Sequence, residues 1–459
     1  MMTRNDNDPE TVKRGSQTAR GVARRTALML PLAGALSGCG FFDDLFFSEK
    51  PKTPGKRLDV MTARRGLTPD ATPRRVTLPP PTPRPNSPQA GGTPSHEAGH
   101  PAIGDVLVQA WKAKIGEGGG YREKIMAVPV IADGRVYTMD SDGAVSAFLA
   151  TDGSRLWRTE TKAKDDESTN VGGGIGFDSG MLFASTGRAE VMAIDPATGK
   201  IGWRKPLPTA ARAAPTIADG TLYVPTLDNQ VFAIDIKDGS RRWAYQSNLV
   251  SMTVLGLPSP AVANGLVIEG FSGGDLTALG TVTGGVSWGD SLASAAGRNS
   301  LVDLSAIRGM PVVAGNQVIA VSLGGVLLAL DLRSGRRLWD REVASADTPC
   351  VAGDWAFILS TDQVVAAVNR NDGHVAWATQ LDQYENMVKQ KDAILWTGPV
   401  LAGDRLLLGG TNKQALAVSP YTGKILGAQE LSAKASYAPV IAGGTVYIVS
   451  DDGTMIALR

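Results

Sequence analysis

Short apolar runs separated by turn residues recur along the chain from Met126 onward, and the copy between Ala214 and Trp243 shows the pattern most clearly. Each run is short, rich in β-branched and aromatic residues and bounded by Gly, Asp or Asn, which is typical of strands and turns. The pattern predicts strands at residues 215–217, 222–225 and 231–236 and around Trp243. Asp219-Gly220 and Asp238-Gly239 favour tight hairpins, because both pairs tolerate positive φ. Each repeat is therefore expected to form one four-stranded antiparallel sheet.

A tryptophan ends most copies of this repeat. The interval between successive copies is 38 to 51 residues, for tryptophans at Trp157, Trp203, Trp243, Trp288, Trp339 and Trp377. This interval is typical of β-propellers, in which each blade is a four-stranded sheet. Recurrence in every blade favours a structural role over a single ligand site. We expect each indole to pack between neighbouring blades with its NH group hydrogen-bonded.

The two ends of the repeat array complete each other. A seventh copy begins at Gly398 and has Leu426 in place of the tryptophan, and an eighth begins at Ala438 but stops after three strands. The segment Val106–Trp111 precedes the first full copy and carries a tryptophan of the same kind. An N-terminal strand that completes the last blade would close the ring and leave no exposed sheet end. The predicted fold is an all-β, eight-bladed propeller of four-stranded blades over residues 102–459.

Residues 1–38 have the features of a lipoprotein signal peptide. Arginines precede an apolar run of signal-peptide length that is too short to span a bilayer, and Cys39 follows Leu36-Ser37-Gly38. This tetrapeptide resembles the bacterial lipobox, so Cys39 is the expected lipid-attachment site. An ordinary signal peptide with a chance cysteine is the alternative. Arg24-Arg25 leaves open whether export follows the general or the twin-arginine route.

Residues 39–101 differ in composition from the repeats. Twelve of the 27 prolines lie between Pro51 and Pro101, and apolar periodicity is missing. This composition predicts a lipidated, proline-rich, disordered tether. Within it, His96-Glu97-Ala98-Gly99-His100 matches the zinc-protease pattern H-E-x-x-H. That pattern needs a helix to bring both imidazoles to one metal ion, and a glycine within it and flanking prolines disfavour one, so no metal site is expected.

Composition excludes several other functions. The formal net charge of +1 offers no electrostatic basis for binding nucleic acid. The other cysteine, Cys350, lies inside a repeat and is expected to be a small buried residue. Asp140-Ser-Asp142-Gly143 and Asp451-Asp452-Gly453 stand where the repeat requires turns, and turn formation is favoured over calcium binding. No nucleophile–base pair or phosphate-binding loop is evident, so we expect no catalytic residues.

The repeat resembles the tryptophan-docking repeat of PQQ-dependent quinoprotein dehydrogenases. The likeness lies in segments such as Ala193-Ile-Asp195 to Trp203 and Ala329-Leu-Asp331 to Trp339, and it extends over residues 106–459. Enzymes of that family hold PQQ against a disulfide of adjacent cysteines, beside a calcium ion and an aspartate base. A propeller with one cysteine cannot form that disulfide. A cofactor-free, non-catalytic propeller is therefore favoured, and a PQQ-dependent periplasmic oxidoreductase is the alternative.

A lipobox, a tether and a non-catalytic propeller of this repeat together resemble the BamB family of outer-membrane assembly lipoproteins. In that family apolar side chains followed by an arginine, between the third and fourth blades, help to dock the barrel-forming partner. Met252, Val254 and Leu255 occupy the corresponding stretch, with Leu255 where the arginine would be, and they are the predicted partner-binding residues. Ala306 and Arg308 stand where the family can carry aspartates. The alternative for the three apolar residues is plain inter-blade core.

The resemblance also implies a location and partners. The expected place is the periplasmic face of the outer membrane, reached through the lipid anchor, because Gly40 is not the aspartate associated with retention at the inner membrane. The expected partner is a BamA-like barrel assembly protein, and unfolded outer-membrane proteins are a further possible partner. The resemblance predicts a scaffold of the barrel assembly machinery; an adaptor for another envelope complex is an alternative to this function.

Replacing Cys39 with Ala tests the anchor. We expect Cys39→Ala to be released as a soluble periplasmic protein or to accumulate as uncleaved precursor, because acylation supplies the membrane affinity. Fractionation and mass spectrometry of the mature N-terminus measure this. Wild-type protein that begins at another residue and carries no lipid would contradict the prediction.

Overall fold

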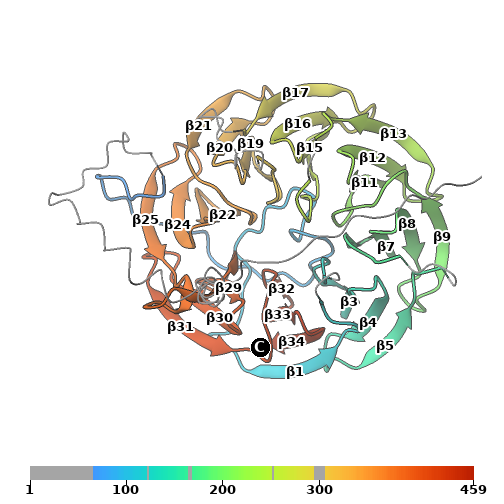
Figure 1. Cartoon of the computed structure of the whole chain (residues 1–459), viewed down its shortest axis with the longest axis horizontal. Coiled ribbons are helices and arrows are strands. Elements are labelled where there is room, and N and C mark those ends of the chain that lie inside the picture. The colour runs from blue at the N-terminus through green and yellow to red at the C-terminus, as the bar shows by residue number, and fades with distance from the viewer. Residues whose placement is uncertain (1–65, 121–123, 164–167, 251–252, 294–304) are drawn as a thin grey trace, which may run out of the picture. The chain divides into compact units, whose positions relative to one another are not determined.

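The computed structural model describes residues 66–120, 124–163, 168–250, 253–293 and 305–459. In this part of the chain all regular elements except isolated bridges are β-strands, and no helix is present that could cross a membrane. The strands form eight four-stranded antiparallel sheets and one two-stranded hairpin. Figure 1 shows the eight sheets arranged as the blades of a closed ring. The predicted fold class is confirmed.

The blades follow one another along the chain, each running from its innermost to its outermost strand. Blades 1 and 2 contain β2 (Val130–Ala132), β3 (Arg135–Met139), β4 (Val145–Leu149), β5 (Arg155–Thr159), β6 (Gly173–Asp178), β7 (Met181–Thr186), β8 (Glu190–Ile194) and β9 (Ile201–Pro206). Blades 3 and 4 contain β10 (Thr216–Ala218), β11 (Thr221–Thr226), β12 (Gln230–Asp235), β13 (Arg241–Gln246), β14 (Ala261–Ala263), β15 (Leu266–Gly270), β16 (Asp275–Gly280) and β17 (Val286–Ser291).

The remaining blades keep the same order. Blades 5 and 6 contain β18 (Val312–Ala314), β19 (Gln317–Val321), β20 (Leu327–Asp331), β21 (Arg337–Arg341), β22 (Cys350–Ala352), β23 (Trp355–Leu359), β24 (Val364–Asn369) and β25 (Val375–Gln380). The extra hairpin β26 (Tyr384–Asn386) and β27 (Lys391–Ala393) follows. Blades 7 and 8 contain β28 (Trp396–Ala402), β29 (Arg405–Gly410), β30 (Gln414–Val418), β31 (Ile425–Glu430), β32 (Val440–Ala442), β33 (Thr445–Ser450) and β34 (Thr454–Leu458), with β1 (Gln109–Lys114) outermost in blade 8.

Blade 8 closes the ring with strands from both ends of the chain. β1 pairs antiparallel with β34, and Trp111 lies opposite Ala457. The sequence predicted this closure, although the strand begins at Gln109 and not at Val106. Val108 instead exchanges backbone hydrogen bonds with Arg459 just outside the strand.

The cores of the ring lie between adjacent blades. Second strands such as β11 are buried along their whole length, because both faces of the sheet are covered by neighbouring blades. Outermost strands such as β13 bury mainly their tryptophan. The burial gradient explains why the inner strands are continuous apolar runs, while the outer strands are polar apart from one aromatic residue.

Seven tryptophans join each blade to the next, as the repeat predicts. Each indole NH donates a hydrogen bond of 2.7–3.1 Å to a backbone carbonyl in the following blade, from Trp111, Trp157, Trp203, Trp243, Trp288, Trp339 and Trp377. The glycine four residues before a tryptophan makes room for the tryptophan of the preceding blade, not for its own. For example, a Cβ on Gly239 would lie less than 3.0 Å from the ring of Trp203. The repeat therefore encodes two neighbouring contacts around the ring.

Blade 7 corrects one expectation. The register pairs Ala417 with Gly427, the position that pairs with tryptophan in the other seven blades, so Gly427 and not Leu426 replaces the tryptophan. The physical reason lies in blade 8, where the outer strand is β1, from before the first blade, and no hairpin turn joins it to β34. A tryptophan in blade 7 would have no glycine turn to pack against. Ile103 and Leu107 of the entering chain pack at this seam instead.

The predicted tether is ordered where the structure describes it, and for residues 66–101 the prediction of disorder is wrong. The compact unit that contains the blades also includes residues 66–101. The first described residues lie on the outer edge of blade 6: the backbone NH of Asp70 donates to the Val375 carbonyl, and its carboxylate pairs with Arg341 at 2.6 Å. The segment then passes inward, with Val76 buried in the core between blades 6 and 7.

Residues 84–101, here called the collar, encircle the centre of the ring. The collar contacts blades 8, 1, 2, 3, 4, 5, 6 and 7 in that order, through hydrogen bonds to Gly443, Ile131, Phe177, Ile217, Val262, Val313, Val351 and Gly403. All but the bond from Ile217 to the Gln89 side chain join backbone to backbone. In Figure 1 the collar is the light-blue trace that loops around the middle of the ring, inside the blades. A segment without regularly spaced apolar residues cannot form a core of its own. It can still be ordered by backbone hydrogen bonds to the inner strands and turns of the blades.

The two histidines of the false metal pattern hold the collar in place. The backbone is not helical there, since His96 and Gly99 both have φ near +62°. His96 Nδ1 lies 2.8 Å from the Pro311 carbonyl in blade 5. His100 Nδ1 donates to the Pro79 carbonyl at 2.8 Å, and its Nε2 accepts the backbone NH of Asp404 at 3.0 Å. The imidazoles therefore bind different blades and no common metal.

His96 makes the stability of the ring depend on pH. Complete burial lowers the pKa of His96 from 6.5 to about 4, so the folded state disfavours its charged form. A depressed folded pKa gives stability that is present above the unfolded pKa and is lost as the pH falls. From this residue we expect a loss of about 2 kcal/mol between pH 7 and pH 5. In His96→Gln this loss should disappear, as measured by chemical denaturation at both pH values; an unchanged loss in the variant would refute the assignment.

Candidate docking site

The two faces of the ring are built differently. The collar binds the face that carries the turns between the first and second strands of the blades, such as Gly403 and Gly443. In an antiparallel blade, the connections from one outer strand to the next inner strand must then leave from the opposite face. That opposite face, here called the connection face, carries the segments 247–260, 305–311 and 381–395. The predicted partner-binding residues belong to the first of these segments.

The segment between blades 3 and 4 exposes apolar side chains. Leu255 is 46% exposed and Val254 is half-buried, while Met252 lies outside the described residues. Leu257 is buried and its backbone NH donates to the Arg212 carbonyl at 3.3 Å, which fixes the end of the segment. Gly256 between them has φ +81°, a backbone conformation that suits glycine. Leu255 is thus a surface residue and not inter-blade core.

An exposed arginine from the next connection lies near Gly256 of this segment. Arg308 is exposed, and a side chain added to Gly256 would come within 3.8 Å of its Nε atom. Ala306, two residues earlier, is buried. Leu255 stands where the resemblance implies an arginine. The sequence alone does not show that Arg308, which belongs to another connection, approaches the same segment.

The connection between blades 6 and 7 carries an element that the repeat did not predict. The hairpin β26–β27 exposes Met387 and Val388 at its tip, and Val388 is 95% exposed. Its base is held by Trp396, which is buried and donates its indole NH to the Asp382 carbonyl at 2.9 Å. The only sequence signal is the unusual length of this connection. Leu395 adds a further exposed apolar side chain, so the connection face has apolar surface at two places.

The groups that could suggest chemistry are used structurally. The buried Asp140 carboxylate pairs with Arg158 at 2.8 Å and accepts backbone NH groups of Asp142 and Ala144, which is the expected turn chemistry. Asp452 accepts the NH of Thr454 in the same way. In the described part of the chain no three His, Cys, Asp or Glu side chains are arranged to hold a metal ion.

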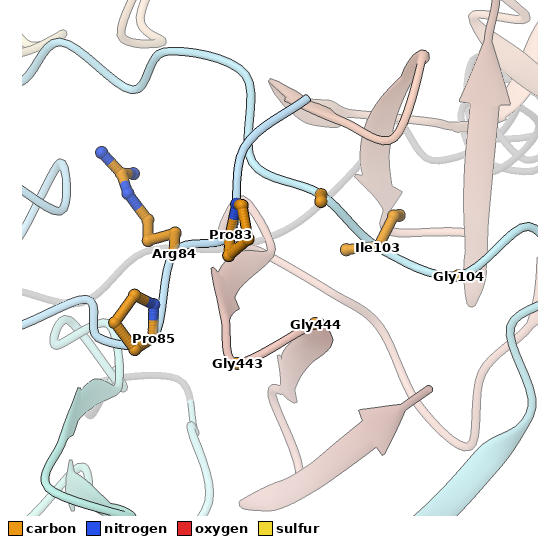
Figure 2. A pocket seen from close by; sticks show the side chains of 8 residues that line it. Pro83, Arg84, Pro85, Ile103, Gly104, Gly443 and Gly444 are labelled. Atoms are coloured by element: carbon orange, nitrogen blue, oxygen red, sulfur yellow. The ribbon is translucent and has the colours of Figure 1, made fainter. Parts of the chain in front are cut away.

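One cavity lies on the collar side and is lined by no reactive group. Figure 2 shows this pocket of about 500 Å³ between Pro83–Pro85, Ala102–Gly104 and the Gly443-Gly444 turn. Its lining is apolar apart from Arg84. The Arg84 guanidinium donates to the Glu97 carbonyl of the collar at 3.4 Å, and burial lowers its pKa. Arg84 thus belongs to the packing of the collar.

Comparison with known proteins identifies the family. The family model described as outer membrane protein assembly factor BamB matches residues 109–168, 141–379 and 380–459. The chain belongs to the BamB family. A relative of that name from Bordetella pertussis is 26% identical over 360 residues, which cover 78% of this chain and 88% of the relative.

Solved structures agree on the fold. The crystal structure of BamB from Moraxella catarrhalis has a TM-score of 0.67 and 23% identity, covering 77% of this chain and all of that one. Quinohemoprotein alcohol dehydrogenase from Comamonas testosteroni has a TM-score of 0.62 and 14% identity, covering 82% of this chain and 80% of that one. The quinoprotein likeness concerns the fold alone. As a BamB-family member, the chain is an outer-membrane protein assembly factor and not an enzyme.

The single propeller cysteine gives a chemical prediction. Burial raises the pKa of Cys350 to about 11, and its Sγ accepts the NH of Leu401 at 3.3 Å. In native Cys39→Ala protein at pH 8, an aromatic disulfide reagent should react about 100-fold more slowly than in the denatured chain, because the thiolate fraction is lower by that factor. Absorbance of the released thiol follows the reaction. Fast labelling of the native protein would contradict the burial.

Proposed function

We propose that this chain is a non-catalytic scaffold lipoprotein of the outer-membrane barrel assembly machinery. Acylated Cys39 anchors it to the periplasmic face of the outer membrane, and the propeller binds the BamA-like barrel-forming protein. The observation that carries the proposal is a group of three side chains on the connection face. Leu255 and Arg308 are exposed and Val254 is half-buried. Protein interfaces draw most of their energy from a few apolar and arginine anchors of this kind.

The collar supports the choice of face. It covers the centre of the opposite face and uses the hydrogen-bonding groups of inner strand ends in all eight blades. An extended partner could not pair with those groups without displacing the collar. The connection face has no such covering in the described part of the chain, and its apolar side chains are available to a partner.

The proposal is tested with the triple variant Met252→Asp, Val254→Ser and Leu255→Glu. Capture of the periplasmic part of the barrel-forming protein should fall at least tenfold, because the apolar contacts are replaced by polar groups that must be desolvated. The melting temperature should change little, since Leu255 is exposed and Val254 is half-buried. Pull-down titration and thermal denaturation measure the two quantities.

A matched control uses exposed apolar residues elsewhere on the ring. Val282→Asp, Val286→Ser and Leu156→Glu make the same kind of change at the outer edge of blades 1 and 4. This control should capture the partner like wild type. Full capture by the first triple variant would place the docking surface elsewhere, and unfolding of that variant would show that the segment is core.

A further inference from the structure

Blade 4 contains a buried carboxylate where the fold calls for an apolar or small side chain. Glu269 of β15 lies opposite Thr277 of β16, which lies opposite Gly289 of β17, so the three residues form one row across a single face of the sheet. The register places Glu269 in the same position as Thr138, Ala184, Val224, Ala320, Ile358, Leu408 and Ile448 of the other blades. Glu269 is the one ionisable residue of the eight.

Glu269 has no partner in the described part of the chain. Its relative exposure is 0%, and neither carboxylate oxygen accepts or donates a hydrogen bond. Burial raises the pKa of this carboxyl well above its ordinary value. Packing gains nothing from such a group, because an unpartnered buried polar atom costs free energy. The position therefore requires an explanation other than stability.

The row leads outward to a polar pocket. Gly289 and Thr277 line a cavity of about 450 Å³ between blades 3 and 4, together with Tyr245, Asn248, Asp275 and Asp290. Because Gly289 has no side chain, nothing on the outer strand covers the path to Thr277. Asn248 belongs to the same connection as Val254 and Leu255. The pocket is thus lined by the start of the connection that carries the proposed docking segment.

The pocket contains a carboxylate that lacks a cation. Asp290 is neutralised by Arg337 through two hydrogen bonds of 2.7 and 2.9 Å. Asp275 accepts only the Asn248 amide, at 3.0 Å, and forms no ion pair among the described residues. Asp275 lines the pocket without a cation, and the buried Glu269 lies one strand further inward, opposite Thr277, so the pocket favours a positive charge.

Blade 2 shows which group fits such a site. Glu190 occupies the position of Asp275, and Arg204 occupies the position of Gly289. There the Arg204 guanidinium lies 3.6 Å from the Glu190 carboxylate and donates to the Thr161 carbonyl at 2.7 Å. Blade 4 has the carboxylate, Asp275, but has Gly289 where blade 2 has the arginine. Blade 2 therefore shows that a guanidinium fits beside a carboxylate at this position of a blade.

We propose that the pocket between blades 3 and 4 receives an arginine side chain from the docked protein. The guanidinium enters over Gly289, pairs with Asp275 as Arg204 pairs with Glu190, and approaches Glu269 behind Thr277. The identity of the docked protein rests on the proposed function; the arginine site does not. The partner is thus a chain that presents an arginine beside an apolar patch matching Val254 and Leu255.

A small ligand tests the site without the partner. N-acetyl-arginine amide is titrated into the full-length Cys39→Ala protein labelled with ¹⁵N-glycine, and the Gly289 amide signal is followed by NMR. A saturable shift is expected for the arginine amide, at least a tenfold weaker response for the neutral citrulline amide, and at least tenfold weaker binding by Asp275→Asn. The absence of a saturable shift, or equal responses to both amides, overturns the proposal.

The substitution Gly289→Arg tests the site with the chain's own arginine. Gly289 does not have a positive φ, and a Cβ there would come no closer than 3.9 Å to another atom, so the variant should fold. Its arginine should fill the pocket, raise the melting temperature above that of the matched Gly289→Gln variant, and reduce partner capture at least tenfold. Gly289→Gln should capture the partner within threefold of wild type.

The outcomes separate the two proposals. If Gly289→Arg captures the partner like wild type while the Met252, Val254 and Leu255 variant does not, the docking function stands and the arginine site is wrong. If the arginine amide binds in the pocket and neither variant affects capture, the docked protein does not use the pocket, its docking surface lies elsewhere on the ring, and the proposal that it supplies the arginine is wrong. Equal loss of capture in Gly289→Arg and Gly289→Gln would assign the effect to bulk and overturn the arginine site.

Discussion

Closing the ring is the constraint on which the rest of this structure depends. A blade has two apolar faces and can bury both only if another blade lies on each side, so a linear stack would always leave two faces bare. The tryptophan contacts meet this constraint between neighbours: an indole NH bonds to the next blade, and a glycine of that blade makes room for the ring. In one repeat, the tryptophan contacts the following blade and the glycine contacts the tryptophan of the preceding blade.

The contact between blades 7 and 8 is the one that lacks a tryptophan, and it shows how the same constraint is met in another way. The outer strand of blade 8 is β1, so no hairpin turn joins β34 to it and none can receive a tryptophan from blade 7. Gly427 stands at that position, and Ile103 and Leu107 supply apolar contacts from the entering chain. A missing tryptophan thus marks the closure point of a ring as clearly as the split blade does.

The sequence predicted the features that recur in every blade, and it did not reveal the features that occur only once in the structure. Periodic apolar runs and regular tryptophans were enough for eight blades, their order and the strand exchange in blade 8. Residues 66–101 were expected to be disordered because they lack an apolar period, yet their order comes from backbone groups at strand ends, which leave no trace in composition. The proximity of Arg308 to Gly256, and the row from Glu269 to Gly289, depend on the three-dimensional register between distant segments. Leu255 could be named from the sequence, but whether it was core or surface could not.

The collar also determines how a mechanical load enters the ring. β1 closes the ring through five paired residues, and a pull on its N-terminal end would open these pairs one after another, like a zip. In this chain, tension arriving from before Gly66 meets the bonds of Asp70 and then the collar's bonds to eight blades before it can reach β1. The force is distributed over the blades before it acts on the pairing of β1 with β34. A pulling force applied on the N-terminal side of the propeller can thus be resisted without separating the strands that close the ring.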